Sequence, residues 1–340
     1  MSETKWYEKC GAESDVVVSS RIRLARNLKD YPFPHLLNAQ QKKEIAQKVQ
    51  KAIEESNSYI AKEFQFMDMA ELSDVQTGAL LEKHLISPVF ANDRKGKYLF
   101  LTQDETVSIM INEEDHLRIQ VLSEGLSVET AYNTADKIDT LLDNALGFAF
   151  HDKLGYLTQC PTNIGTGLRA SVMLHLPSLQ SGKQIERLKD SLYKIGFTLR
   201  GTFGEGTQSF GAMYQLSNQI TLGLSEETAI ENLRRVTMQV IENERATRSQ
   251  FCKRTETQDY IMRSLGTLKY ARLMSNQENM KLLSAVRMGV NENIIDKITI
   301  STINKLMVEL QPYTLTLQYG KECNASQRDL LRAEILRKTL

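Results

Sequence analysis

The chain has 340 residues with 42 basic and 42 acidic side chains, so its formal net charge is zero. This balance gives no general electrostatic attraction to nucleic acid or to an anionic membrane. No apolar run approaches the roughly 20 residues of a membrane-spanning helix, and the charged N-terminus lacks the apolar segment of a signal peptide. The four cysteines form no C-x-x-C pair, which favours a reducing, cytoplasmic location over a disulfide framework or a zinc site.

The first predicted element is a strand over residues 16–24, VVVSSRIRL. Side chains alternate between the two faces of a strand. The alternation groups Val17, Ser19, Arg21 and Arg23 on one face, and Val18, Ser20, Ile22 and Leu24 on the other. The two arginines therefore point the same way. Taken alone, this segment is explained most simply as a solvent-exposed edge strand.

An amphipathic helix follows over residues 38–55, and its expected role is structural. Asn38 and Gln41 have the spacing of a capping box, and apolar residues recur on one face every four positions. His84 then lies in a predicted loop, HLISP, where a single histidine is usually structural.

Two strands joined at residues 103–105 are predicted within residues 97–122. The second begins VSIMI and continues through NEEDHLRIQVL, where apolar and polar residues alternate. If that strand is unbroken, Glu114 lies on the same face as Arg118. An exposed acidic turn is the alternative for the E-E-D part of this stretch.

A helix over residues 128–150 leads to a loop and a further strand. The loop, TQCPTNIGTG, is rich in turn residues and contains a single cysteine, Cys160. In the strand, Ala170, Val172, Leu174 and Leu176 alternate with Arg169, Ser171, Met173 and His175. This pattern predicts one buried face. A surface turn before an ordinary strand is the alternative for the loop.

The next predicted elements are a helix ended by Gly196, a short strand and a glycine-rich loop, FTLRGTFGEGTQS. In that strand Phe197 and Leu199 face one way, and Thr198 and Arg200 the other. A strand, a turn and a helix capped by Ser225 close this part of the chain.

From about residue 254 the pattern is helical only. The predicted helices cover residues 255–272, 276–288, 301–310 and 327–339, the last capped by Ser326. This change of character predicts three parts. They are an N-terminal segment 1–15, a catalytic domain 16–246 and an all-helical C-terminal domain 255–340.

Five arginines lie on the polar faces of predicted strands: Arg21, Arg23, Arg118, Arg169 and Arg200. On one sheet they would form a concave cationic floor. A guanidinium group donates two parallel hydrogen bonds to a phosphate. The chain has neither a G-x-x-x-x-G-K-[ST] loop nor a dinucleotide fingerprint. The sequence therefore predicts that side chains, and not a glycine-rich cradle, bind a polyphosphate.

Five segments together resemble the signature segments of the phosphagen (guanidino) kinases: VVVSSRIRL, NEEDHLR, TQCPTNIGTGLRASVMLHLP, RGTFGE and YQLSNQITLGLSEETAIENL. The resemblance implies an α+β fold, with a mostly antiparallel sheet flanked by helices, and phosphoryl transfer from ATP to a guanidinium group. The catalytic positions in that family correspond to Glu114, Glu205, Cys160 and Arg118. A guanidinium is a poor nucleophile until it is aligned and deprotonated, a task that suits two carboxylates. The cysteine would contact a guanidinium nitrogen as a thiolate.

The same resemblance implies which residues bind ATP. They are Ser19, Ser20, Arg21, Ile22, Arg23, His84, Arg118, Arg169, Ala170, Ser171, Val172, Met173, Arg200, Gly201, Thr202, Phe203, Gly204 and Glu205. His84 would lie beside the base. Magnesium is expected mainly on the nucleotide phosphates, with water held near Glu113 or Asp115, and no metal site made of protein ligands is expected.

Two departures from the small-molecule members of the family resemble its bacterial protein-arginine kinases. The S-S-R-x-R motif begins at residue 19, without the helical domain that precedes it in the small-molecule kinases, and R-D-L-L-R-A lies near the C-terminus. In that branch the second motif forms an allosteric phosphoarginine pocket. Its residues here are Arg328, Asp329, Arg332 and Ala333. A solvated amphipathic helix is the alternative for these six residues.

The resemblance therefore implies an ATP-dependent protein-arginine kinase that phosphoarginine activates. The implied partners are arginine-bearing protein substrates, an activator protein, a Clp-type protease that degrades marked stress regulators or misfolded proteins, and a second copy in a homodimer. Nucleic-acid and membrane partners are not expected. A small-molecule guanidino kinase fits the N-terminus less well. A non-catalytic phosphoarginine adaptor fits the intact Glu114, Cys160 and Glu205 less well.

Overall fold

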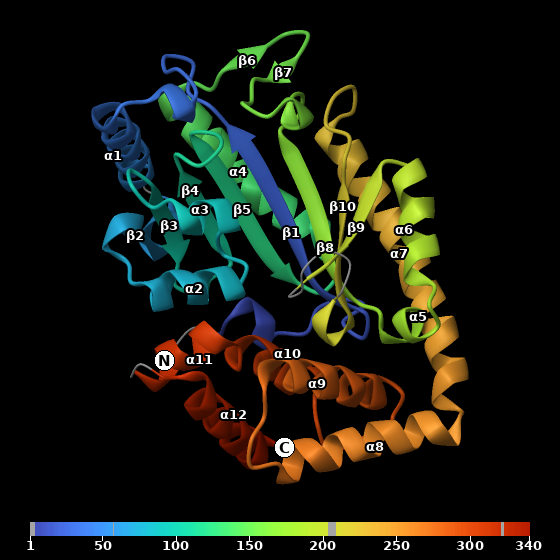
Figure 1. Ribbon diagram of the computed structural model, residues 1–340. Helices are drawn as coiled ribbons and strands as arrows, with labels where there is room; N and C mark the ends of the chain where they lie inside the picture. The colour runs from blue at the N-terminus through green and yellow to red at the C-terminus, as the bar shows by residue number, and fades with distance from the viewer. Residues whose placement is uncertain (1–3, 57, 203–208, 321–322) are drawn as a thin grey trace.

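The computed structural model describes residues 4–56, 58–202, 209–320 and 323–340. Its centre is an eight-stranded antiparallel sheet with the strand order β2-β3-β4-β5-β1-β8-β10-β9 (Figure 1). The strands are β1 Val17–Arg26, β2 Phe64–Asp68, β3 Tyr98–Thr102, β4 Val107–Ile111, β5 Leu117–Glu124, β8 Leu168–His175, β9 Phe197–Gly201 and β10 Met213–Asn218. A small hairpin, β6 Phe150–His151 and β7 Gly155–Tyr156, precedes the loop of Cys160.

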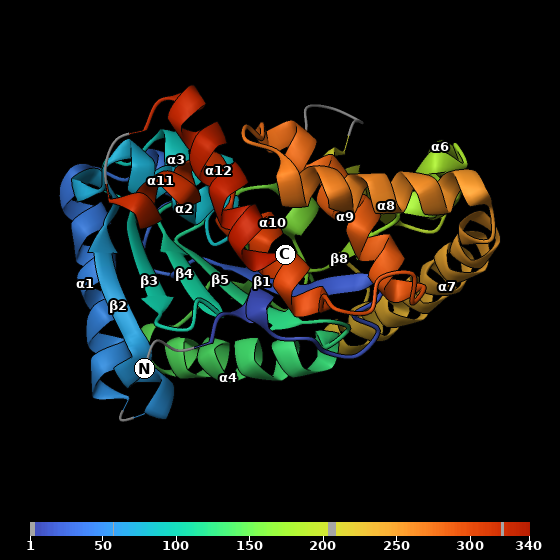
Figure 2. The same ribbon diagram turned by 90° about the horizontal axis from the view of Figure 1, so that it is seen from below.

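The main apolar core lies between one face of the sheet and the helices that cover it. These helices are α1 Ala39–Glu55, α4 Val128–Leu146, α6 Ile185–Lys194 and α7 Glu226–Cys252. Figure 2 shows α4 running beneath the central strands. Ile22 of β1, Ile119 of β5, Val172 of β8 and Leu142 of α4 are all buried there. Each such side chain contributes about 1.5–3 kcal/mol by burial, so this core fixes the sheet that carries the arginines.

The C-terminal region is helical and packs along one end of the sheet (Figures 1 and 2). It contains α8 Thr255–Tyr270, α9 Asn276–Asn291, α10 Ile300–Glu309, α11 Pro312–Tyr319 and α12 Ala325–Thr339. Its apolar core also includes Met173 of β8 and Met213 of β10, so the helices contact the sheet directly. Short helices α2 Asp74–Glu82, α3 Pro88–Asn92 and α5 Pro177–Ser181 complete the fold. The α+β class with a helical C-terminal region is confirmed.

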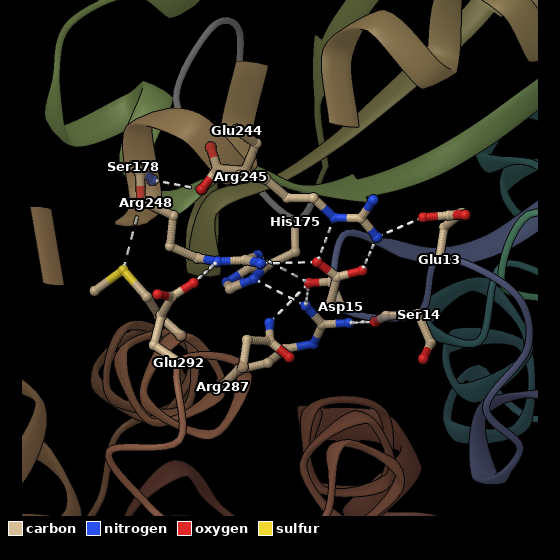
Figure 3. Close-up of polar contacts among 12 residues, drawn as sticks. Glu13, Ser14, Asp15, His175, Ser178, Glu244, Arg245, Arg248, Arg287 and Glu292 are labelled. Atoms are coloured by element: carbon tan, nitrogen blue, oxygen red, sulfur yellow. Dashed lines mark hydrogen bonds and ion pairs between the residues drawn. The ribbon is translucent and has the colours of Figure 1, made fainter. Parts of the chain in front are cut away.

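A partly buried polar cluster connects α9 of the C-terminal region, and α7 before it, to the ends of two central strands (Figure 3). The Asp15 carboxylate, just before β1, lies 2.7 Å from Arg248 Nη2 and 2.6 Å from Arg245 Nη2. Arg287 of α9 donates through Nη1 to the Asp15 carbonyl oxygen and lies 2.9 Å from His175 Nδ1. His175 ends β8 and is fully buried; burial and the neighbouring Arg287 charge lower its pKa well below the usual value. The helices thus contact the strands that carry three of the five arginines.

One expected face assignment in β1 is wrong. Val17 lies in the main core together with Ile22, whereas Val18 packs on the opposite side. The pairing of β1 with β8 shifts register between Val17 and Ser19, which is the mark of a β-bulge. The bulge reverses the alternation for Val17 and Val18 and leaves Arg21 unaffected. The second face of β8 is buried as well, because the C-terminal helices cover it.

The long strand predicted from Val107 is also wrong, because a turn interrupts it. β4 ends at Ile111 and β5 begins at Leu117. Asn112 has a φ of 61°, and its side chain donates to the carbonyl oxygens of Lys42 and Gly96 at 3.0 and 2.9 Å. Asparagine tolerates this left-handed conformation better than most residues. The catalytic-carboxylate segment therefore begins in a turn and not within a strand.

Several helix boundaries differ from those expected, and three of the differences have a clear local cause. α4 ends at Leu146, where Gly147 adopts a φ of 68°. Pro312 does not merely end a helix: it begins α11, because proline loses nothing at the first helical position. α12 begins at Ala325 and not at residue 327, and its N-cap is Asn324, whose Oδ1 accepts from Gln327 N at 3.0 Å.

Candidate active site

Five arginines from four strands line one cavity of about 470 Å³. Arg118 comes from β5, Arg21 and Arg23 from β1, Arg169 from β8 and Arg200 from β9. Arg23 is paired in register with Arg169, so the two residues lie opposite each other on neighbouring strands. The sheet order therefore turns five distant sequence positions into a single cationic surface.

Burial and mutual repulsion make this surface unfavourable unless an anion binds. Burial, followed by the charges of Arg118 and Arg169, lowers the pKa of Arg21 to about 10. The pKa of Arg23 is lowered well below its usual value by burial and then by the neighbouring arginines. A bound polyphosphate would relieve this repulsion, and guanidinium groups match its oxygens in pairs.

Arg118 is held by two adjacent carboxylates. Its Nη1 lies 2.5 Å from Glu113 Oε2, and its Nη2 lies 3.2 Å from Glu114 Oε2. The Glu113 side chain is only 2% exposed and also accepts a hydrogen bond from Ser87 Oγ, whereas the Glu114 side chain is 36% exposed. Glu113 therefore fixes Arg118, and Glu114 remains accessible to a substrate.

The loop of Cys160 is tied to this carboxylate segment. Gln159 N donates to Asp115 Oδ1 at 2.8 Å, so the residue before Cys160 is bound to the residue after Glu114. Cys160 is partly exposed, and its Sγ lies 3.1 Å from Thr162 Oγ1. Charges on Cys160 and Glu114 both act to raise the pKa of Arg169, which burial and Arg200 lower overall. Cys160, Glu114 and Arg169 thus share one electrostatic environment.

His84 lies on the wall of the same cavity. Its φ is 60°, and its carbonyl oxygen accepts from Gln120 Nε2 at 3.0 Å. Burial, assisted by the charge of Arg21, lowers the pKa of His84 to about 3, so the imidazole is neutral near pH 7. A neutral ring in this position suits contact with an uncharged base better than contact with phosphate.

Several residues expected at the ATP site do not turn their side chains to the cavity. Ser20, Ile22, Ala170 and Val172 are buried on the opposite face of the sheet. Met173 packs in the core of the C-terminal helices, and Ser19 is buried outside the cavity lining. Ser171 lies beside the floor, where its Oγ accepts from Arg21 Nε at 3.4 Å. Gly201 and Thr202 do line the cavity. Phe203, Gly204 and Glu205 lie outside the described residues.

Sequence reasoning missed other residues that line the cavity: Glu82, Gln120, Gln215, Ser217 and Met110. Gln215 Oε1 accepts from Arg21 Nη2 at 2.5 Å and thereby orients that guanidinium. The alternation in β5 already placed Gln120 on the face of Arg118, so Gln120 could have been predicted as a lining residue. Glu82 carries no such signal.

Comparisons with known proteins identify the family. A family model described as the ATP:guanido phosphotransferase C-terminal catalytic domain matches residues 44–247, and one described as the protein-arginine kinase McsB C-terminal domain matches residues 254–340. A protein-arginine kinase of Pelotomaculum thermopropionicum is 43% identical, covering 99% of this chain and 96% of that protein. One of Moorella thermoacetica is 45% identical, covering 99% and 97%. The chain belongs to the protein-arginine kinase family. The resemblance found in the sequence is thereby confirmed.

Solved structures agree with this protein-arginine kinase family assignment at the level of the fold. The duplicated taurocyamine kinase of Schistosoma mansoni, solved with bound transition state analog components, aligns with a TM-score of 0.61 and 29% identity over 72% of this chain. The aligned part spans about a third (34%) of that duplicated chain. Lombricine kinase aligns with a TM-score of 0.61 and 24% identity, covering 70% of this chain and 68% of its own.

In this protein-arginine kinase family member, the R-D-L-L-R-A motif lies in the first turns of α12. Arg332 is buried: its Nε donates to Leu310 O at 2.9 Å, and its Nη1 donates to Met274 O and Asp329 Oδ1, both at 2.7 Å. Arg328 is partly exposed and donates through Nη1 to Cys323 O at 2.6 Å. Ala333 is fully buried. The motif is therefore a bonded part of the helical core and not a freely solvated helix.

The described helices include none that is both long and apolar enough to cross a membrane.

His116, within the catalytic-carboxylate segment, makes the stability of this protein-arginine kinase family member sensitive to pH. Its Nδ1 accepts from Leu28 N at 3.0 Å, so Nε2 carries the proton that bonds Pro32 O at 2.8 Å. Burial lowers the pKa of His116 to about 4, although the bond to Pro32 opposes the shift. The stabilising contribution of a histidine with a depressed pKa is complete above the unfolded value of 6.5 and is lost as the pH falls toward 4.

We expect this contribution to fall by about 1.4 kcal/mol for each pH unit below 6.5. Chemical denaturation of the native protein and His116→Asn, at about pH 7.5 and about pH 5.5, measures it. The native protein should lose about 1.4 kcal/mol more than the variant over this interval. Equal losses would contradict a buried, neutral His116.

Proposed function

We propose that the protein transfers the γ-phosphoryl group of ATP to arginine side chains of other proteins. The observation that carries this proposal is the cavity lined by five arginines with Glu114 bonded to one of them. Family membership supports the reaction class, and the names of the protein-arginine kinase relatives support a protein acceptor.

The arrangement of side chains suits this reaction. The arginine floor would bind the phosphates and neutralise charge on the transferring group. Glu114 would orient the substrate guanidinium and accept the proton that its attacking nitrogen loses. The new N–P bond forms as the bond between γ-phosphorus and the bridging oxygen breaks, and ADP leaves. Cys160 would hold a second guanidinium nitrogen. Glu205 would provide a second carboxylate.

Magnesium would bind mainly to the nucleotide phosphates. Among the described residues, no group of three His, Cys, Asp or Glu side chains could hold a metal ion. Glu113 is engaged with Arg118, and Asp115 Oδ1 accepts from Asn27 Nδ2 and Gln159 N at 2.6 and 2.8 Å. Near the phosphates, Glu113 or Asp115 would hold the ion through water. Its contribution would be to neutralise phosphate charge.

An acceptor competition tests the proposal against its two alternatives. The protein is incubated with ATP and either free arginine or an unfolded arginine-rich protein, and acid-labile phosphate is measured. We expect phosphate on the protein and little on free arginine. Preferential phosphorylation of free arginine would favour a small-molecule guanidino kinase. No transfer to either acceptor would favour a non-catalytic phosphoarginine adaptor.

Cys160→Ser is expected to lower turnover substantially without abolishing it, because the thiol helps to place the guanidinium and forms no covalent bond with phosphorus. The loss should be smaller than that caused by replacing Glu114. Steady-state kinetics on the unfolded protein substrate measure the effect. A stable phosphocysteine detected by mass spectrometry would contradict this role and indicate nucleophilic catalysis.

We also propose that phosphoarginine binds at Arg328 and Asp329 and raises the activity. Arg328 lies in the first turn of α12, where a cation is unfavourable to the helix dipole unless an anion binds nearby. Asp329 would bind the guanidinium portion. Because Arg332 is buried and bonded to two carbonyl oxygens, it would shape the pocket together with Ala333. A homodimer, an activator protein and delivery of marked stress regulators or misfolded proteins to a Clp-type protease belong to the same proposal, as does action in the cytoplasm.

The double change Arg328→Ala with Asp329→Ala is expected to remove activation by phosphoarginine while the unstimulated catalytic domain stays folded. Thermal unfolding of the double variant checks that the fold is kept. Calorimetry with free phosphoarginine measures binding directly. Undiminished binding to the double variant would mean that the motif is only part of the helical core.

A further inference from the structure

Glu82 belongs to the catalytic part of the chain but is hydrogen-bonded to the C-terminal helices. It ends α2 and lines the arginine cavity. Its Oε1 accepts from Tyr313 N at 2.9 Å, and its Oε2 accepts from Thr314 N at 2.7 Å and from Thr314 Oγ1 at 2.9 Å. These donors form the first turn of α11, which has no N-cap side-chain bond of its own. Glu82 therefore acts as the cap of a helix from the other part of the protein.

The two helices also pack too closely to move independently. Gly78 lies one turn before Glu82 on α2, and a Cβ atom added there would lie 2.4 Å from Cγ of Tyr313. Figures 1 and 2 both show α11 beside α2. A displacement of α11 must therefore displace α2.

The end of α2 and the segment that follows it form a wall of the arginine cavity. Leu81, Glu82, His84 and Ser87 all line it. On the side of the sheet, Gln120 Nε2 holds this segment through His84 O at 3.0 Å. On the opposite side, α11 holds it through Glu82. The position of the cavity wall thus depends on the C-terminal helices as well as on the sheet.

The phosphoarginine motif is bonded beside the helix that Glu82 caps. Arg332 Nε donates to Leu310 O at 2.9 Å, two residues before α11 begins at Pro312. Burial raises the pKa of Glu82, while the bonds from Tyr313 and Thr314 and the charge of Arg328 oppose this shift. An anion bound at Arg328 would cancel part of the positive charge that favours ionised Glu82. The Glu82 carboxylate is therefore affected both by its hydrogen bonds to α11 and by the charge of Arg328.

We infer that Glu82 is a positioning residue for the nucleotide, through which the C-terminal helices set the wall of the ATP cavity. Occupancy of the Arg328 site then changes ATP affinity through the same contact, a step that rests on the proposed binding of phosphoarginine. The coupling is reciprocal, so ATP also changes the affinity for phosphoarginine.

Thr314→Val tests the positioning role without touching the cavity. Valine keeps the shape of threonine but loses the bond to Glu82. We expect the KM for ATP to rise about threefold to tenfold, the range for one lost hydrogen bond, with kcat changed less than about twofold. The matched control is Thr316→Val on the same helix, whose hydroxyl bonds Pro312 O at 2.8 Å and not Glu82. Equal KM values for the two variants would overturn the inference.

Glu82→Gln separates this inference from the proposed function. Calorimetry measures phosphoarginine binding to the native protein and to this variant, each with and without ADP. We expect phosphoarginine to bind both, with ADP changing its Kd only in the native protein. A change of equal size in Glu82→Gln would overturn the inference. If phosphoarginine fails to bind the native protein, the proposed activation is wrong, and the comparison of Thr314→Val with Thr316→Val still decides whether Glu82 positions the nucleotide.

Discussion

Glu114→Gln is expected to reduce turnover by at least about 10²-fold. The amide keeps the size of the carboxylate but cannot accept the proton that the guanidinium must lose. Glu114 is the more exposed of the two carboxylates on Arg118, so it is the one placed to meet a substrate. Single-turnover kinetics with an unfolded protein substrate measure the chemical step. ATP affinity should change little, because Glu114 is not assigned to phosphate.

Glu113→Gln provides the matched control for Glu114→Gln. Glu113 fixes Arg118 and is almost fully buried, so its loss should disturb the phosphate site and raise the KM for ATP. Glu113→Gln would then raise the KM for ATP, whereas Glu114→Gln would leave ATP affinity nearly unchanged. Near-normal turnover in Glu114→Gln would contradict the assignment of Glu114 as the base.

Arg118→Lys should be almost as damaging as Arg118→Ala. The guanidinium bonds Glu113 through Nη1 and Glu114 through Nη2, and a single ammonium nitrogen cannot reproduce this fork. Removing one donor that stabilises the transition state typically costs about 10²- to 10³-fold in turnover. The same measurement with lysine and alanine at Arg169 extends the test to the next strand.

The lysine variants at Arg118 and Arg169 together show whether phosphate binding needs the guanidinium geometry or only a positive charge. If lysine restores full activity at Arg118 and at Arg169, only the positive charge matters, and the bidentate phosphate floor is wrong. Circular dichroism and thermal unfolding establish that each variant is folded, because both arginines lie on central strands.

The arginine floor could be predicted from sequence because alternation in a strand needs only local information. Each arginine of the floor lay on the polar face of a predicted strand whose other face is apolar. The sheet order brings all five to one cavity: Arg21, Arg23, Arg118, Arg169 and Arg200. The bulge at Val17 and Val18 could not be predicted, since it depends on how β1 pairs with β8. An acidic turn at E-E-D was the alternative for the stretch after Ile111, but VSIMI and LRIQVL both have the pattern of a strand. The left-handed Asn112 that begins the turn gives no periodic signal in the sequence.

Contacts between the catalytic part and the C-terminal helices could not be predicted from the sequence, for a different reason. Asp15 and Arg287 are 272 residues apart, and no periodicity connects them. The same holds for Glu82 and Thr314, separated by 232 residues. The predicted helix 301–310 stops just before Pro312, and no helix was predicted after it, although proline at the first helical position is equally consistent with the start of one. Because α11 was not predicted, the sequence offered no hydrogen-bond partner for Glu82, and its role could not be inferred.

The most direct test of the central claim is to locate the phosphate after reaction with ATP. An unfolded arginine-rich protein is incubated with ATP and either the native protein or Glu114→Gln, and the modified residues are mapped by mass spectrometry under conditions that preserve acid-labile N–P bonds. We expect phosphate on arginine side chains with the native protein and at least about 10²-fold less with the variant. Phosphate on serine, threonine or tyrosine, or equal arginine phosphorylation by the variant, would contradict it.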